Sequence, residues 1–224
     1  MKIFIDSANI EEIKKANDLG IIDGVTTNPT LFKKSKNDKN EKNKYDIRKF
    51  IDELRIIDFN DPVHIEIMSD KSEQMVKEAE SLSEISEHIV VKIPICEEGL
   101  KAIKLINDND IILTNATLCF SVNQAILASK AGADFVSFFI GRMVDISNNG
   151  MQAVGEIVNI FGNFNIETNV IAASIRDPLH VIETAKMRVQ IATIPYNILQ
   201  MMIRHPLTEI GMKRFKDDFE ILTK

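Results

Sequence analysis

Short apolar segments rich in β-branched residues alternate with longer amphipathic segments along the whole chain. A strand followed by a helical crossover is the repeating unit of a parallel sheet, because parallel strands need a connection long enough to return over one face. Eight such units in 224 residues predict a single (β/α)₈ (TIM) barrel domain over residues 1–224. The predicted strands are Lys2–Asp6, Gly24–Thr27, Val63–Ile67, Ile89–Pro94, Ile111–Asn115, Phe135–Phe139, Asn169–Ser174 and Gln190–Ile194.

Two regions depart from this alternation. The segment Lys33–Lys44 is polar and rich in Lys and Asn, so we predict a mobile surface loop, with an attraction for phosphate as the alternative. After the eighth strand His205-Pro206 interrupts the chain, and residues 207–222 carry Phe215 and Phe219 on one stripe. This pattern predicts an extra C-terminal helix that either caps the barrel or contacts a neighbouring subunit.

The composition, with 45% hydrophobic and 27% charged residues, is that of a soluble globular protein. A net charge of −6 argues against a nucleic-acid partner, because such binding takes its affinity from an excess of Lys and Arg. No apolar run approaches the roughly 18 residues of a membrane span, so we expect no membrane partner. The N-terminal run Ile3–Ile5 is too short for a signal peptide, and we therefore expect a cytoplasmic protein.

Metal-ligand patterns are absent from the sequence. Cys96 and Cys119 lie far apart without a C-x-x-C partner, which is typical of a reducing compartment and offers no zinc framework. We expect both to be small buried side chains. His88, His180 and His205 are isolated and lack ligand spacing, so we predict no metal site.

Lys92 is the most informative charged residue, because it lies near the end of the apolar strand Ile89–Pro94. A barrel strand is buried on both faces, and burial disfavours an ammonium ion. We therefore expect part of this amine to be uncharged, the form that attacks carbonyl groups. A lysine that extends to solvent, or one held in an internal ion pair, is the alternative.

Other polar residues fall at the ends of the predicted strands, which in (β/α)₈ barrels surround the active site. Asp6 and Glu66 would form an acid/base pair beside Lys92, although Asp6 is also a candidate helix cap or counter-ion of a structural lysine. Asn28 and Asn115, with neighbouring threonines, suit a ligand with several hydroxyl groups. The alternative is that these side chains cap their own turns.

Two arginines, a serine and a helix start predict a phosphate site. Arg142 follows the sixth strand, and Ser174 and Arg176 follow the seventh, just before the helix that Asp177-Pro178 opens. Guanidinium groups and a helix N-terminus both bind phosphate. The alternative is that the arginines pair with Asp145 or Asp177 at the surface.

Several segments resemble the short transaldolase family, which also contains fructose-6-phosphate aldolase. The resemblance covers nearly the whole chain except the Lys/Asn-rich segment, and it implies a (β/α)₈ barrel, phosphorylated sugar substrates and no cofactor. It also implies a ring-shaped homo-oligomer, commonly a pentamer or decamer. The segments are Phe4–Asn9 (FIDSAN), Gly24–Leu31 (GVTTNPTL), Val91–Pro94 (VKIP), Thr114–Ser121 (TNATLCFS), Gly141-Arg142, Ala173–Arg176 (ASIR), Ala192–Pro195 (ATIP) and His205–Thr208 (HPLT).

The resemblance implies a role for each candidate residue. Lys92 would form an imine with the ketose, and Asp6 would exchange the proton of the C4 hydroxyl. Glu66 and Thr117 would hold a water that carries protons during imine formation. The hydroxyl groups of the retained three-carbon unit would be bound by Asn28, Asn115 and Ser137, and the phosphate by Arg142, Ser174 and Arg176.

Within the family, Glu66 and Phe139 favour transaldolase, because the aldolase branch has glutamine and tyrosine at the corresponding positions. The implied reaction converts sedoheptulose 7-phosphate and glyceraldehyde 3-phosphate to erythrose 4-phosphate and fructose 6-phosphate, within the pentose phosphate pathway. A fructose-6-phosphate aldolase and a non-catalytic sugar-phosphate-binding barrel are the alternatives. The chain departs from the family at His64, where a serine is usual, and at Phe138, where a proline precedes the phenylalanine.

Overall fold

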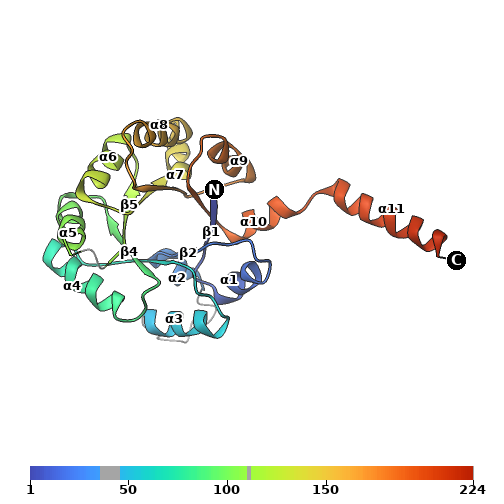
Figure 1. The fold of residues 1–224 in the computed structure, drawn as a ribbon, viewed down its shortest axis with the longest axis horizontal. Helices are drawn as coiled ribbons and strands as arrows, with labels where there is room; N and C mark the ends of the chain where they lie inside the picture. The colour runs from blue at the N-terminus through green and yellow to red at the C-terminus, as the bar shows by residue number, and fades with distance from the viewer. Residues whose placement is uncertain (36–45, 110–111, 224) are drawn as a thin grey trace.

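The eight strands form a closed barrel in chain order, with every strand parallel to its neighbours (Figure 1). The structure is a computed structural model and describes residues 1–35, 46–109 and 112–223. The predicted (β/α)₈ barrel is confirmed. The strands are β1 (Lys2–Asp6), β2 (Val25–Thr26), β3 (Val63–Glu66), β4 (Ile89–Pro94), β5 (Thr114–Cys119), β6 (Phe135–Phe139), β7 (Asn169–Ala173) and β8 (Ile191–Ile194).

Helices surround the barrel, and several of them begin at a residue whose side chain caps the helix. Asn9 accepts a hydrogen bond from the backbone N–H of Glu11, and Asp177 accepts one from that of His180. The helices are α1 (Ile10–Asn17), α2 (Pro29–Ser35), α3 (Ile47–Ile56), α4 (Ser72–Ser83), α5 (Glu97–Asn107), α6 (Val122–Ala131), α7 (Ile140–Asp145), α8 (Gly150–Asn163), α9 (Pro178–Lys186), α10 (Tyr196–Ile203) and α11 (Pro206–Leu222).

Two apolar clusters stabilise the fold. The larger one contains residues of both strands and helices, for example Ile93 of β4 and Ile103 of α5. The smaller one consists of Phe4, Ile171 and Ile191, with Phe135 packed against it. Because side chains two residues apart on a strand point to the same face, Asp6 and Ser137 lie one layer above Phe4 and Phe135. The upper part of the barrel interior is therefore polar and rests on an apolar floor.

The fifth strand differs from its prediction, Ile111–Asn115. β5 begins at Thr114, and the preceding Leu113 is 49% exposed. The apolar run before Thr114 predicted a strand. The observed strand instead contains polar residues, and those on its inner face line the polar layer. In the observed register Asn115 lies beside Lys92. Thr117 then follows Asn115 on the same face of β5.

The loop predicted for residues 33–44 is wrong for its first three residues. Lys33, Lys34 and Ser35 form the last turn of α2, and residues 36–44 lie outside the described residues. Cys119 is buried as expected. The prediction was wrong for Cys96, which is exposed and accepts a hydrogen bond from the Gly99 backbone N–H at the start of α5.

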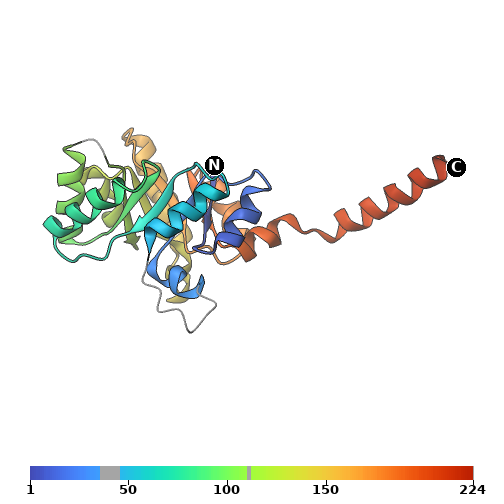
Figure 2. The ribbon, with the colours of Figure 1, turned by 90° about the horizontal axis from the view of Figure 1, so that it is seen from below.

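The extra C-terminal helix is present as α11, and it extends away from the barrel (Figures 1 and 2). None of its residues is buried, and Leu207, Phe215 and Phe219 are 69%, 73% and 64% exposed. The alternative in which this helix caps its own barrel is therefore wrong. Over the described ranges, no helix is both long and apolar enough to cross a membrane.

Candidate active site

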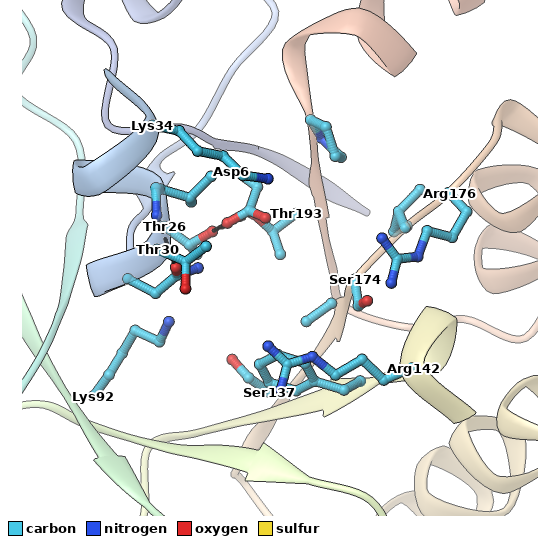
Figure 3. Close-up of a pocket in the computed structure, with 16 residues that line it drawn as sticks. Asp6, Thr26, Thr30, Lys34, Lys92, Ser137, Arg142, Ser174, Arg176 and Thr193 are labelled. Carbon is cyan, nitrogen blue, oxygen red and sulfur yellow. Dashed lines mark hydrogen bonds between the residues drawn. The ribbon is translucent and has the colours of Figure 1, made fainter. Parts of the chain in front are cut away.

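A pocket of about 210 Å³ opens at the carboxyl ends of the strands (Figure 3). Figure 3 shows Lys92 and Asp6 on one side of this pocket and Arg142 and Arg176 on the other. The barrel thus gathers side chains that are up to 189 positions apart in the sequence, from Asp6 to Pro195. Seven of the ten candidate site residues line the pocket: Asp6, Asn28, Lys92, Ser137, Arg142, Ser174 and Arg176.

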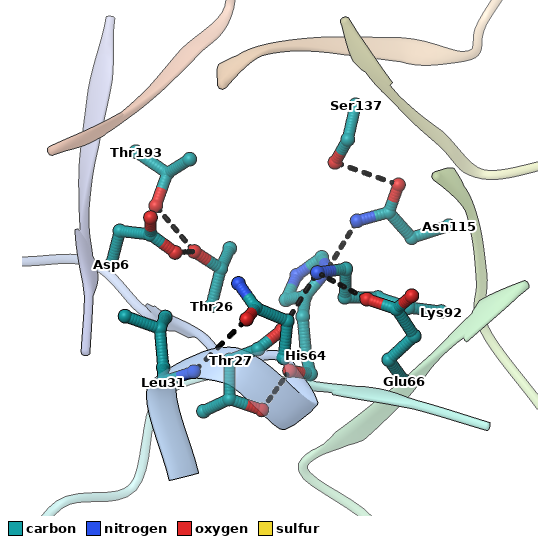
Figure 4. Close-up of polar contacts among 11 residues, drawn as sticks. Asp6, Thr26, Thr27, Leu31, His64, Glu66, Lys92, Asn115, Ser137 and Thr193 are labelled. Carbon is teal, nitrogen blue, oxygen red and sulfur yellow. Dashed lines mark hydrogen bonds and ion pairs between the residues drawn. The ribbon is translucent and has the colours of Figure 1, made fainter. Parts of the chain in front are cut away.

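Lys92 lies at the centre of the polar layer and is 3% exposed. Its Nζ donates a hydrogen bond to the backbone carbonyl of Thr27 at 2.7 Å and lies 3.4 Å from Oε2 of Glu66 (Figure 4). Register explains the second contact, because Glu66 of β3 is the direct neighbour of Lys92 on β4. The internal ion pair considered above is thus present, and the same amine lines the pocket.

Asp6 ends β1 and has its carboxylate in the pocket. Burial raises the pKa of Asp6, while the charges of Lys92 and Lys34 and a hydrogen bond from Thr26 partly oppose this shift. Thr26 donates that bond to Oδ1 at 2.8 Å, and its oxygen also contacts the Thr193 hydroxyl. The helix-cap alternative for Asp6 is wrong, because Asn9 caps α1. Asp6 is therefore a carboxyl group that can hold a proton at a higher pH than an exposed aspartate.

Beside Lys92, Asn115 of β5 bridges Ser137 of the neighbouring strand β6 and His64 of β3, which lies two strands away on the other side. Its Oδ1 accepts a hydrogen bond from Ser137 Oγ at 3.0 Å, and its Nδ2 lies 2.9 Å from Nδ1 of His64 (Figure 4). Thr117 Oγ1 is buried and has no hydrogen-bond partner within the described part of the chain. Asn115 and Ser137 therefore lie in the polar layer with Lys92, and Thr117 lies two residues further along β5, level with Pro94.

Asn28 serves both of the purposes considered for it. Its side chain lines the pocket, and its Oδ1 accepts a hydrogen bond from the backbone N–H of Leu31 at 3.1 Å. Asn28 therefore caps its own turn, as the alternative predicted, and also lines the pocket.

The opposite side of the pocket is cationic. Arg142 lies over the Phe139 ring, with its Cζ 5.1 Å from the ring centroid, and Arg176 pairs with Asp145 at 2.8 Å. The close approach of α7 to β7 depends on Gly141, because a Cβ there would lie 2.0 Å from the backbone oxygen of Ser174. The surface ion pair predicted as an alternative for one arginine is present, yet Arg176 also lines the pocket with Arg142 and Ser174.

Three further polar residues of the pocket were not predicted from the sequence: Thr30, Lys34 and Thr193. Lys34 falls within the predicted loop 33–44, whereas in the structure it lies on α2 and its charge lowers the pKa of Asp6. Thr193 lies in the predicted strand Gln190–Ile194 and in a segment that resembles the family, but no role was predicted for it. A signal for Thr193 did exist, since it occupies an inward position near the end of β8.

Residues 3–224 match the family model described as Transaldolase/Fructose-6-phosphate aldolase. A protein named "Probable transaldolase" from Clostridium botulinum (strain Eklund 17B / Type B) is 49% identical over 224 residues, which is 100% of both chains. A protein of the same name from Thermoanaerobacter sp. (strain X514) is 47% identical over 219 residues, 98% of this chain and 97% of the relative.

Among solved structures, a thiamine phosphate pyrophosphorylase from Pyrococcus furiosus superposes with a TM-score of 0.56 and 16% identity. The match covers 87% of this chain and 85% of that one, and at this identity it shows the fold alone. The family match and the two relatives are evidence for the family as well as the fold, because they extend over nearly all of the sequence. They show that the chain belongs to the transaldolase/fructose-6-phosphate aldolase family.

Proposed function

We propose that this protein is a transaldolase that transfers a dihydroxyacetone unit between sugar phosphates through an imine at Lys92. The observation that carries the proposal is the buried Lys92 amine, which lines a pocket together with Asp6 and lies 3.4 Å from Glu66. An amine beside two carboxyl groups can form an imine and exchange the protons that the reaction requires. Membership of the family supports this chemistry.

Cleavage begins when Lys92 adds to the C2 carbonyl of the ketose and water is lost. The protonated imine then accepts the electrons of the C3–C4 bond as Asp6 takes the proton of the C4 hydroxyl. An aldose phosphate leaves, and an enamine remains on Lys92. Adding this enamine to a second aldose phosphate, with return of the proton from Asp6 and hydrolysis of the imine, completes the transfer.

Glu66 and Thr117 are proposed to hold the water that exchanges protons during imine formation. The contact between Glu66 and Lys92 lets the carboxylate remove the proton that the amine must lose before it attacks. Thr117 offers a buried hydroxyl that has no partner among the described residues. Such a group costs free energy unless a water or ligand binds it, which supports a water at this position.

Substrate binding is divided between the two sides of the pocket. Asn28, Asn115 and Ser137 would bind hydroxyl groups of the retained three-carbon unit. Arg142, Ser174 and Arg176 would bind the phosphate, which would compete with Asp145 for Arg176. This division places the uncharged reacting carbons near Lys92 and the phosphate at the exposed end.

Transfer is favoured over simple cleavage by Glu66 and Phe139, which differ from the glutamine and tyrosine of the aldolase branch. The relatives named probable transaldolase support the same choice. The reaction would be the exchange of sedoheptulose 7-phosphate and glyceraldehyde 3-phosphate with erythrose 4-phosphate and fructose 6-phosphate, in the pentose phosphate pathway. The free thiols of Cys96 and Cys119 fit a cytoplasmic enzyme.

We also propose a ring-shaped homo-oligomer, a pentamer or decamer, in which α11 packs against a neighbouring subunit. The support is its large exposed apolar surface, which includes Leu207, Phe215 and Phe219. A contiguous exposed apolar surface on a helix is typical of a protein interface.

Borohydride reduction with fructose 6-phosphate tests the main proposal, because it converts an imine into a stable secondary amine. Mass spectrometry should find a reduced three-carbon adduct on Lys92 and none in the Lys92→Ala variant. Binding of the sugar without an adduct or turnover would instead support the non-catalytic barrel. Free dihydroxyacetone formed without erythrose 4-phosphate, at a rate equal to transfer, would support the aldolase.

A further inference from the structure

His64 is a buried polar residue to which the proposed reaction assigns no step. It lies on β3, is 0% exposed, and packs against two phenylalanine rings of the barrel floor. Its ring centroid is 5.3 Å from that of Phe4 and 5.0 Å from that of Phe135, both in edge-to-face geometry. The imidazole thus lies between the apolar floor and the polar layer that contains Lys92.

The ring is neutral in this position. Burial lowers the pKa of His64 to about 3, and the nearby charge of Lys92 acts in the same direction. A neutral imidazole has one nitrogen that donates and one that accepts. Nε2 is buried without a partner among the described residues, whereas Nδ1 lies 2.9 Å from Asn115 Nδ2. Because an amide NH₂ group can only donate, Nδ1 accepts this hydrogen bond and Nε2 carries the ring proton.

The contact with His64 decides which way round the Asn115 amide is held. The other end of the amide meets Ser137, whose hydroxyl can either donate or accept, so that Ser137 alone would accommodate both orientations. An imidazole nitrogen that accepts can bind only the NH₂ end. With Nδ2 bound to His64, Oδ1 faces Ser137 and accepts a hydrogen bond from its hydroxyl. The lone pairs of the Ser137 oxygen are then left for a hydroxyl group in the pocket.

We propose that His64 is a positioning residue that orients the Asn115 amide, and through it Ser137, to bind hydroxyl groups of the three-carbon unit. The inference rests on the proposed function, because it concerns the sugar hydroxyls that this function places at Asn115 and Ser137. His64 itself touches no substrate and acts through Asn115.

Two substitutions separate this role from simple packing. His64→Phe keeps a ring of similar size against Phe4 and Phe135 but removes the acceptor. His64→Asn loses the ring and keeps a polar atom near the place of Nδ1. If His64 positions Asn115, His64→Phe should raise the KM for fructose 6-phosphate by about tenfold with kcat changed less than about threefold. His64→Asn should keep KM within about threefold of the wild type.

A double-mutant cycle with Asn115→Ala supplies a second readout. If His64 acts through Asn115, His64→Phe should no longer raise KM once the Asn115 amide is absent. Should His64→Phe fail to fold in a thermal melt, His64→Gln replaces it, because the longer amide reaches the Nε2 side of the ring instead of the Nδ1 side. It should show the same rise in KM.

The opposite pattern, with KM unchanged in His64→Phe and raised in His64→Asn, would overturn the inference in favour of packing. An equal rise in both variants, or a full effect of His64→Phe in the Asn115→Ala background, would also overturn it. Borohydride trapping of the wild-type protein distinguishes a failure of this inference from a failure of the proposed function. An adduct on Lys92 without the KM pattern defeats this inference alone, whereas no adduct in the wild type defeats the proposed function and this inference with it.

Discussion

The Nζ atom of Lys92 lies 3.4 Å from Oε2 of Glu66, and the two side chains are only 4% and 13% exposed. They belong to neighbouring strands and face each other in the register. In such surroundings removing one charge of the pair leaves the other buried charge with less compensation, so the pair should respond strongly to substitution. The pair also joins the proposed nucleophile to a base that can take its proton.

Glu66→Gln should slow imine formation by about 10²-fold, because an amide of the same shape cannot accept a proton and general acid–base groups contribute at this level. The measurement is the rate of borohydride trapping on Lys92 after mixing with fructose 6-phosphate. Glu73→Gln, at an exposed glutamate on α4, is the matched control and should trap at the wild-type rate. Equal trapping rates in Glu66→Gln and the wild type would contradict the role given to this carboxylate.

Asp6→Asn should lower kcat by about 10²-fold or more and yet leave the fold as stable as the wild type, or more stable, at neutral pH. Burial raises the pKa of Asp6 on folding, so the folded chain binds this proton more tightly than the unfolded chain. The unfolding free energy of the wild type therefore falls as pH rises through the folded pKa of Asp6. The Asp6→Asn variant has no group that titrates at this position, so this decrease should be absent.

Thermal melts at pH 4.5 and pH 7.5 check the effect of Asp6 on stability. The gain of the Asp6→Asn variant over the wild type should be larger at pH 7.5. A variant that loses more stability at pH 7.5 than at pH 4.5 would show that the ionised carboxylate stabilises the fold instead.

Lys34→Gln should move the acid limb of the kcat/KM profile to higher pH. The charge of Lys34 lowers the pKa of Asp6, and its removal leaves less of this group ionised at a given acidic pH. Asp6 must be ionised to take the C4 hydroxyl proton, so activity on the acid limb should fall. Lys33→Gln, at an exposed lysine on the same helix, is the control. An identical shift in both variants would indicate a general change in surface charge.

His64 should make the wild-type fold sensitive to acid. The pKa of this group is lowered to about 3, so below about 6.5 the unfolded chain binds a proton that the folded chain does not bind. The unfolding free energy should fall as pH drops, by about 2–3 kcal/mol at pH 4.5 from this group alone. The groups that face the ring are Lys92, Asn115, Phe4 and Phe135.

Urea unfolding at pH 7 and pH 4.5 measures this dependence on His64. His64→Asn should lose less stability between the two values than the wild type. His205→Asn, at an exposed histidine, should behave as the wild type does. Equal losses in His64→Asn and the wild type would show that other groups cause the acid sensitivity.

Phe215→Ser combined with Phe219→Ser should reduce the mass of the assembly in light scattering. Neither ring is buried within its own chain, so the barrel should remain folded by circular dichroism. Lys216→Ser on the same helix is the matched control and should keep the assembly intact. If the double variant has the mass of the wild type, α11 is not the interface.

The barrel could be predicted because its signals are local. Each strand is a short apolar run, each helix is amphipathic with a cap such as Asn9 or Asp177, and the order of the segments alone indicates a parallel sheet. Lys92 could be found in the same way, because a charged residue within the apolar strand Ile89–Pro94 breaks a local pattern. The prediction failed at β5, where the strand that lines the site is more polar than the segment before it.

The contacts that give the site its chemistry were decided by the tertiary structure. Thr193 lies 167 positions from Thr26 and His64 lies 51 positions from Asn115, yet their side chains meet. The positive charge of Lys34 reaches Asp6 only because α2 follows the end of β2. Apolar periodicity records whether a side chain is buried but not which side chain lies opposite. That pairing is determined by strand register and by closure of the barrel, which require all eight strands together.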